Sequence, residues 1–391
     1  MIAWLAVAAL AGSFADSFTG YALPSVAVDT DDGFGAGGRT AFAWYKEGYA
    51  PYKMGLTASA YVATSGYQNH RLRLDRVGLG AKKRLRVTAF LAFRQWLNDR
   101  YYGIGNGTLR QLPYADVTDK GDPRSRYYRY RLFQPMGQLT GRYQLADGSP
   151  WEIFGAINPK YSVIEAYDES LLEQEQPYGY RAGGAIQLVG GILHDTREPE
   201  IAPLAGHFLE ASVRATPSID RQAGGFGGGL LSARFYAGGE RLVLAHRTMA
   251  EWLVGNVPFY EMVHWGGSQP IAGFGGGNTL RGVPFGRWRA PGKAVAQTEL
   301  RWAFLRHELF DDPFGWELAP YVDVGAAFGA GLQGPAMPLH PGAGGALRII
   351  WDETFVGRID SGWGLDPVQL DDGTIEQRLN WGLYIFADHP F

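Results

Sequence analysis

The chain has 391 residues, a formal net charge of −3 and no cysteine, which excludes a disulfide scaffold and thiol chemistry. Hydrophobic residues make up 46% of the chain, which is enough to form a core and excludes a disordered protein. Because 36 basic residues face 39 acidic ones without a basic block, no nucleic-acid partner is expected. The 55 glycines and the 14% share of aromatic residues favour a β-rich protein with many turns.

The N-terminal segment has the pattern of an export signal. Residues 1–12 are apolar, and Ser13 and Ala15 then give a small-x-small cleavage pattern. We therefore expect residues 1–15 to be a secretory signal peptide. No Lys or Arg precedes the apolar run, so a buried first strand or helix is the alternative. Further along, no apolar run approaches the roughly 20 residues that a membrane-spanning helix needs.

Apolar and polar residues alternate along many later segments. Between Leu209 and Thr216 every second residue is apolar, and the residues between them include Glu210, Ser212 and Arg214. The same alternation recurs in 85–94, 242–248 and 347–351. This is the period of a β-strand. A soluble β-sandwich would turn the polar face to water, whereas a transmembrane barrel turns the apolar face to lipid and the polar face to its lumen.

Three observations favour the barrel. The alternating segments run about 10 to 14 residues, longer than most soluble strands and long enough to cross a bilayer at a tilt. Aromatic residues cluster at segment ends, as at Tyr101 and Tyr102. The predicted signal peptide supplies the export route that an outer-membrane protein needs. Strands are expected at 21–29, 33–45, 52–64, 67–76, 83–96, 126–139, 149–164, 180–194, 205–217, 227–238, 241–256, 294–305, 316–328, 343–352, 355–363 and 378–389. The sequence thus predicts an all-β, 16-stranded antiparallel transmembrane β-barrel.

The lengths of the connections fit this topology. If both termini are periplasmic, each connection from an odd to an even strand faces the outside of the cell. The three long connections, 97–125, 165–179 and 257–293, all join an odd strand to an even one. Most connections from an even to an odd strand are short, which is the asymmetry that bacterial barrels show.

The most unusual segment is glycine-rich and covers residues 266–288. It contains the sequence LRGVPF at 280–285, followed by Arg287. This resembles the VRGF/Y-type loop motif of the BamA/TamA superfamily, also called the bacterial surface antigen family, whose members are 16-stranded outer-membrane barrels. Other pieces resemble the family in the same order, namely a D-x-R turn at 195–197, an E-L-R strand at 299–301, a Y-x-D-x-G strand at 321–325 and the terminal Phe391. The resemblance covers residues 16–391.

The resemblance implies that the extracellular connection at 257–293 folds back into the lumen of the barrel. The motif residues of this loop are Leu280, Arg281, Gly282, Phe285 and Arg287. Arg281 is then expected to meet Asp323, Glu299 or both on the inner wall, since a secluded guanidinium needs a carboxylate partner. The alternative is that Arg281 is a solvated loop arginine and Asp323 an ordinary luminal acid.

The resemblance also implies roles for residues outside the loop. Asp195 and Arg197 are expected to form a periplasmic turn. The first and last strands are expected to meet at a weak seam. The C-terminal signal read by the barrel-assembly machinery would consist of Trp381, Leu383, Ile385 and Phe391. That machinery, during biogenesis, and outer-membrane lipid are therefore expected partners.

The family's assembly factors and secretion pores carry POTRA domains before the barrel. Here the first predicted strand begins within about a dozen residues of the cleavage site, so no POTRA domain is expected. The resemblance implies a barrel, integral to the bacterial outer membrane, that assists insertion or translocation of proteins or lipids there with a separate POTRA-bearing or periplasmic protein. The alternative is a passive channel or structural barrel that has lost the assembly role, because fold does not fix function.

The sequence gives no sign of an enzyme. The eight histidines are scattered without an HExxH motif, and there is no G-x-S-x-G elbow. His264 near Ser268 is the one candidate catalytic pair, and a loop histidine among aromatic residues is the preferred interpretation. We therefore expect no catalytic residues, no cofactor and no bound metal.

Overall fold

The structure is a computed structural model that describes residues 14–29, 33–115, 117, 119, 121–200, 202–217, 225–309, 312–329, 339–351 and 355–386. Residues 1–13, most of the predicted signal peptide, lie outside the described residues, and so does Phe391 of the predicted C-terminal signal.

Among the described residues, one sheet of 17 strands accounts for most of the chain. Its long strands are β1 (Ser17–Asp29), β2 (Gly33–Tyr45), β3 (Met54–Ala63), β4 (Gln68–Leu79), β5 (Leu85–Arg100), β7 (Arg129–Gln144), β8 (Trp151–Ala166), β9 (Gly183–Asp195), β10 (Gly206–Thr216), β11 (Phe226–Gly238), β12 (Leu242–Gly255), β13 (Gly292–Leu309), β14 (Asp312–Phe328), β15 (His340–Trp351), β16 (Phe355–Gln369) and β17 (Ile375–Phe386). Each of these 16 long strands corresponds to one predicted strand, so the predicted all-β class and strand count are confirmed.

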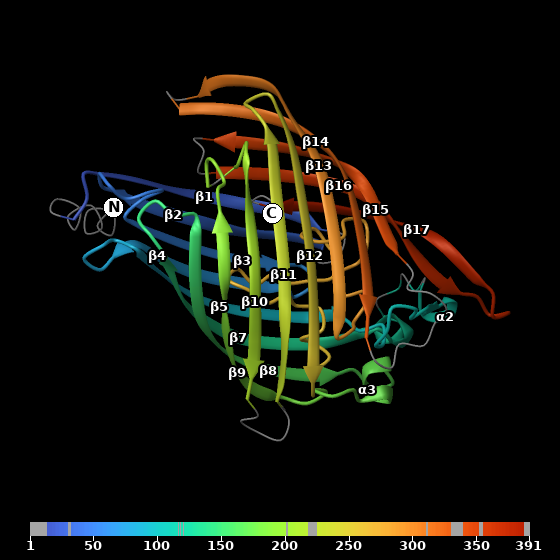
Figure 1. Cartoon of the computed structure of the whole chain (residues 1–391). Coiled ribbons are helices and arrows are strands. Elements are labelled where there is room, and N and C mark those ends of the chain that lie inside the picture. Colours follow the sequence, from blue (N-terminus) through green and yellow to red (C-terminus); the bar gives the residue numbers. More distant parts are fainter. Residues whose placement is uncertain are drawn as a thin grey trace.

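The short elements lie in the connections. The two-residue strand β6 (Arg110–Gln111) pairs in parallel with β16, a pairing that the sequence did not predict. The helices α2 (Leu112–Ala115), η1 (Pro123–Arg126) and α3 (Leu171–Glu175) are single turns. No helix within the described part of the chain is long and apolar enough to cross a membrane. The connections that carry α2 and α3 lie at the end of the sheet away from the N-terminus (Figure 1).

The long strands pair antiparallel in chain order, and the sheet rolls around an interior (Figure 1). β1 pairs with β2 over its whole length and begins at Ser17, four residues before the predicted start at Tyr21. β17 pairs with β16 and lies beside β1. No hydrogen-bonded ladder joins β1 to β17 among the described residues, whereas each of the other neighbouring long strands is joined by one.

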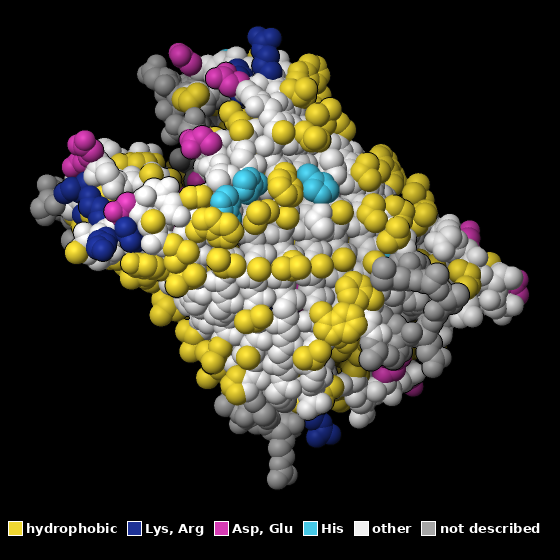
Figure 2. Space-filling view, viewed as in Figure 1, with side chains coloured by type: hydrophobic (Ala, Val, Ile, Leu, Met, Phe, Trp, Pro, Cys, Tyr) yellow, Lys and Arg dark blue, Asp and Glu magenta, His cyan; other side chains and the backbone are white. Residues whose placement is uncertain are grey.

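The two faces of the sheet have opposite character. In β10 the side chains of Glu210 and Arg214 are buried on the inner face, whereas Val213 is 67% exposed on the outer face. Figure 2 shows hydrophobic side chains spread over the outer face, with charged side chains gathered towards its ends. The alternation therefore places apolar residues outside and polar residues inside, as predicted for a barrel and opposite to a soluble sandwich.

The hydrophobic core lies inside the rolled sheet and is built around the connection between β12 and β13. From this connection, Trp265, Phe274 and Trp288 pack in one cluster with Met249 of β12 and Val295 of β13. These three aromatic side chains are at most 1% exposed. The predicted inward fold of the connection at 257–293 is thus what the structure has, with observed limits of 256–291.

Candidate functional site: a loop anchored across the lumen

The connection 256–291, called here the luminal loop, passes close to the backbone of the inner wall. Gly282 has a φ of +90°, and a Cβ on it would lie 2.4 Å from the carbonyl carbon of Trp363 in β16. Only glycine fits this position without strain. The Gly282 N–H donates to the Tyr384 hydroxyl at 3.2 Å, and its carbonyl accepts from Asn380 at 2.7 Å. The loop therefore packs directly on β16 and β17.

Arg281 connects the luminal loop to two strands of the wall. Its Nε and Nη2 donate to the two carboxylate oxygens of Asp323 in β14, each at 2.8 Å, and its Nη1 donates to Glu299 in β13 at 2.6 Å. The backbone N–H of Arg281 also donates to Asp323 at 3.1 Å. The guanidinium carbon lies 3.3 Å from the ring centroid of Tyr321. Arg281 thus meets both expected carboxylates, in the two-pronged geometry that suits a guanidinium.

Arg281 and its two partners are fully buried. Burial alone would lower the pKa of Arg281, but Asp323 and Glu299 raise it well above its usual value. A buried charge is tolerated when it is paired and hydrogen-bonded in this way, and removal of one partner leaves the others uncompensated.

The wall around Arg281 continues the pairing. Glu299 also accepts from Arg348 at 2.6 Å and from Arg301 at 3.0 Å. Arg348 reaches Glu317 at 3.1 Å, and Arg358 pairs with Asp360, which lies 3.5 Å from Arg281. We call this set the paired wall, and its members are Arg281, Glu299, Arg301, Glu317, Asp323, Arg348, Arg358 and Asp360. It holds four arginines and four carboxylates, so its formal charges cancel.

Arg287 fixes the far end of the loop motif. Its Nε donates to Asp366 of β16 at 2.6 Å, while its Nη1 and Nη2 donate to the hydroxyl and carbonyl of Thr108 at 3.0 and 2.8 Å. Arg110 of β6 pairs with the same Asp366 at 2.7 Å. The luminal loop and the connection between β5 and β7 are therefore joined through one carboxylate.

The two apolar motif residues pack against different parts of the molecule. Leu280 is fully buried in the cluster around Trp265. Phe285 is half-buried, and its ring centroid lies 5.1 Å from that of Trp96 in β5. These contacts bring strands that are distant in the sequence against one loop.

The opposite wall holds the loop through Glu261. Its carboxylate accepts from Lys160 of β8 at 2.6 Å and from Gln187 of β9 at 2.9 Å, and lies 3.4 Å from Arg214 of β10. Burial alone would raise the pKa of Glu261, but Lys160 and Arg214 lower it to about 2. Nearby, Ser268 donates through its N–H and hydroxyl to Glu210 at 2.8 and 2.7 Å. The loop is therefore fastened to both sides of the lumen.

The fold of this chain has counterparts among solved structures. No protein-family model and no curated protein matches the chain. Among solved structures it is similar to BamA from Haemophilus ducreyi lacking POTRA domains 1–3, with 11% identity and a TM-score of 0.57 over 95% of this chain and 70% of that one. It is also similar to CdiB from Escherichia coli, with 14% identity and a TM-score of 0.56 over 93% of this chain and 63% of that one. The chain has the fold of the BamA and CdiB barrels.

Within this BamA-like fold, Asp195 and Arg197 lie at the turn that follows β9. The Arg197 guanidinium donates to both oxygens of Asp195, at 2.9 and 2.8 Å, and the guanidinium carbon lies 4.8 Å from the Phe208 ring centroid. The two residues of the predicted turn therefore pair with each other.

The predicted C-terminal signal lies on the outer face of β17, so far as that strand is described. Trp381 is 46% exposed there, and its indole N–H donates to the Ser361 hydroxyl at 2.9 Å. Leu383 and Ile385 are half-buried on the same face, while Tyr384 between them points inward to Gly282.

His264 and Ser268 are both buried within the BamA-like lumen. Ser268 donates to Glu210 rather than to His264, and burial lowers the pKa of His264 well below its usual value. No group of three His, Asp or Glu side chains that could hold a metal ion occurs in the described part of the chain.

Some partners in this site were missed at the level of sequence. Asp360 alternates with apolar residues inside the predicted strand 355–363, so the period of two already put it on the luminal face. Asp366 lies in β16 but beyond the predicted end of that strand. Glu261 and Thr108 lie in connections without periodicity, where no local signal marks their partners. Neither partner of Arg287, Asp366 or Thr108, could therefore be read from the chain.

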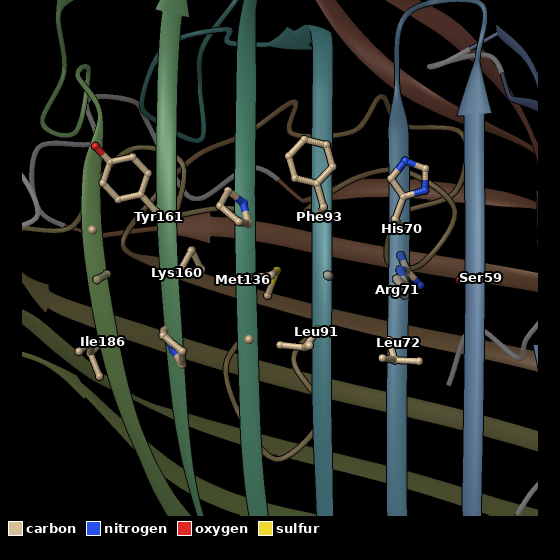
Figure 3. Close-up of a pocket in the computed structure, with 16 residues that line it drawn as sticks. Ser59, His70, Arg71, Leu72, Leu91, Phe93, Met136, Lys160, Tyr161 and Ile186 are labelled. Carbon is tan, nitrogen blue, oxygen red and sulfur yellow. The ribbon is translucent and has the colours of Figure 1, made fainter.

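The outer surface carries a groove across β3 to β9, with a volume of about 750 Å³. Figure 3 shows Tyr161, Phe93 and His70 in one row across neighbouring strands, and Ile186, Leu91 and Leu72 in a second row. Its lining is largely apolar, as expected of a face that contacts acyl chains.

Proposed function

We propose that this chain is an integral outer-membrane barrel that assists insertion or translocation of proteins, or of lipids, together with a separate POTRA-bearing or periplasmic protein. The observation that carries the proposal is the luminal loop, which is fastened to opposite walls by Arg281 and Glu261. The apolar outer face supports the outer membrane as its location. The BamA-like fold supports the class of activity.

The seam between β1 and β17, which no hydrogen-bonded ladder joins among the described residues, supports the same proposal. A strand edge that is not paired along its length can pair with an incoming strand. A lumen occupied by an anchored loop leaves this edge as the route by which a client would reach the lipid. The client would add to the sheet where the native ladder is missing.

The test is insertion of an unfolded barrel protein into lipid vesicles that contain this chain. Because the chain has no cysteine, one cysteine can be introduced in β1 and one in β17 and joined by oxidation. Insertion is expected to be faster than in empty vesicles, to slow when the two strands are crosslinked, and to recover on reduction. A matched control joins Ala58→Cys to Leu72→Cys, which face each other in the paired strands β3 and β4. Unchanged insertion after crosslinking of β1 to β17 would contradict the proposal.

A passive channel or structural barrel is the alternative function. A conductance measurement distinguishes it from the insertion or translocation role. A lumen filled by an anchored loop is expected to give small, flickering currents across a planar lipid bilayer. A large steady pore would favour the channel. Copurification of a POTRA-bearing protein would favour the assembly role.

A further inference from the structure

A cavity of about 380 Å³ lies between the luminal loop and the wall formed by β4 to β12. Of its lining residues, eight are Lys or Arg and none is Asp or Glu. We call it the arginine cavity and define it by Arg71, Arg73, Arg94 and Arg234, whose pairing is described below. Its size is that of a small-molecule site, which in proteins spans roughly 300–1,000 Å³.

Half of the basic side chains in this lining already have partners. Arg142 pairs with Glu152 at 2.6 Å, and Lys160 pairs with Glu261 at 2.6 Å. Arg214 lies 3.0 Å from Glu251. Arg247 donates to Gln297 at 2.9 Å. These contacts offset or satisfy four of the eight groups.

The other four form no ion pair with any described residue. Arg94 and Arg234 are only 9% and 7% exposed, and the Nε atom of each is buried without a hydrogen-bond partner. Arg234 reaches only the side-chain oxygen of Gln269 at 3.4 Å and the ring of Phe208 at 5.0 Å. Burying a cation without a paired counter-charge is costly. Glu210 and Asp195 act on Arg234 only from beyond ion-pair distance, so an anion in the cavity would stabilise both guanidinium groups.

The remaining two arginines extend the positive surface towards the open part of the lumen. Arg71 and Arg73 are exposed and alternate with the outward-facing Leu72 and Leu74 along β4. Arg71 has one hydrogen bond, from its Nε to the Asn69 side chain at 3.0 Å. Two accessible guanidinium groups therefore stand beside the buried ones.

We propose that the arginine cavity binds a phosphate-bearing anion. A phosphate group presents several oxygens to planar guanidinium forks and matches them better than a single point charge would. Amide side chains, including those of Gln138 and Gln269, complete the lining. The ligand is a soluble phosphate compound or the headgroup of an anionic lipid. This proposal does not depend on the insertion role proposed above.

The test measures binding of inorganic pyrophosphate to the purified full chain in micelles of an uncharged detergent, by calorimetry. Saturable binding is expected, and Arg94→Gln with Arg234→Gln should weaken it about tenfold or more, because each loses a charge-assisted hydrogen bond. The matched control is Arg124→Gln with Arg131→Gln, whose side chains are 59% and 45% exposed away from the cavity. It should bind as the unmodified chain does.

A second arm identifies the source of the phosphate. If short-chain phosphatidylglycerol displaces pyrophosphate, the ligand is a lipid headgroup, and if it does not, the ligand is a soluble phosphate compound. Folding of each variant is checked by heat-modifiable mobility. Should the double variant not fold, Arg73→Gln replaces it, since this exposed side chain forms no hydrogen bond or ion pair with described residues, and weaker binding is again expected. No binding by the unmodified chain, or equal binding by the cavity variant, would overturn the proposal.

Discussion

Among the described residues, buried arginines have carboxylate partners on one side of the lumen, and some of those on the other side lack them. On the paired wall, Arg281 and its neighbours meet as many carboxylates as there are guanidinium groups. In the arginine cavity, Arg94 and Arg234 are almost as deeply buried and have no carboxylate partner. The paired wall therefore balances its formal charges within the chain and stabilises the loop. The cavity lacks its counter-charge, which is the property of a site that receives one from a ligand.

The largest effect is expected from Arg281→Ala. It leaves Asp323 buried without its cation and removes one of the three arginine partners of Glu299, so the free energy of unfolding should fall by about 3–5 kcal/mol. The measurement is denaturant unfolding in detergent, with the folded fraction read from heat-modifiable mobility. Arg281→Ala combined with Asp323→Ala should lose much less than the sum of the two single losses. Additive losses would mean that the paired wall is not a coupled network. The control Arg124→Ala should leave unfolding unchanged.

Glu261 should make the opposite anchor sensitive to acid. Its pKa of about 2 in the folded chain lies below the value near 4.3 of an unfolded glutamate. The stabilisation is therefore complete above about pH 4.3 and is lost as the pH falls towards 2, in total roughly 2–3 kcal/mol. Glu261→Gln should flatten the stability curve in this window. The curve of free energy of unfolding against pH, from about pH 8 to 3, checks this, and an unchanged slope below pH 4.3 would count against the anchor.

His264 should contribute to the same curve at higher pH. Because its pKa is lowered in the folded chain, the unfolded chain takes up a proton first, and stability falls as the pH drops below about 6.5. In the Glu261→Gln variant, the loss of stability due to His264 should still begin near pH 6.5. Only the further loss due to Glu261, which begins near pH 4.3, should disappear.

Gly282→Ala tests the backbone beside Arg281. Its positive φ disfavours any side chain, and the added methyl would collide with the β16 backbone, so a loss of about 2 kcal/mol is expected. The matched control is Gly345→Ala in β15, where a Cβ would meet nothing within 4 Å. A similar effect at both glycines would show that the close approach of the loop to β16 is not what matters.

The smallest effect, and one of opposite sign, is expected from Arg94→Met. Removing an unpaired buried charge should leave the free energy of unfolding unchanged or raise it by about 1 kcal/mol in the absence of phosphate. Arg281→Met, made alongside it, should destabilise strongly. If Arg94→Met were as destabilising as Arg281→Met, the contrast between the two walls would fail.

The strands were the most predictable part of this chain. The alternation of Glu210, Ser212 and Arg214 with apolar residues marked β10 and its luminal face without any tertiary information. Boundaries were less predictable. The strand predicted at 83–96 continues to Arg100 as β5, where Asp99 pairs with Tyr130 across the neighbouring strand. Such an extension depends on a partner that lies in another segment.

The residues of the luminal site also differ in whether the sequence predicted them. The motif around Arg281 and the acids at 299 and 323 could be singled out from the sequence, since they match a known pattern. Glu261 and Thr108 could not, because both lie in irregular connections, and Asp366 could not, because it lies beyond the predicted end of its strand. The unpaired state of Arg94 and Arg234 was also invisible, since a lone sequence shows where arginines occur but not which of them lack an acid.

By itself the sequence determined the strands, their number and which side chains face the lumen, because a period of two is a local property of the extended backbone. Only the tertiary structure decided which luminal charges meet. That depends on how the sheet rolls and where the loop crosses it, which brings Arg281 to Asp323 and leaves Arg94 without a carboxylate. Pairing of buried charges is set by distances of a few ångströms between segments far apart in the chain, and no local pattern encodes them.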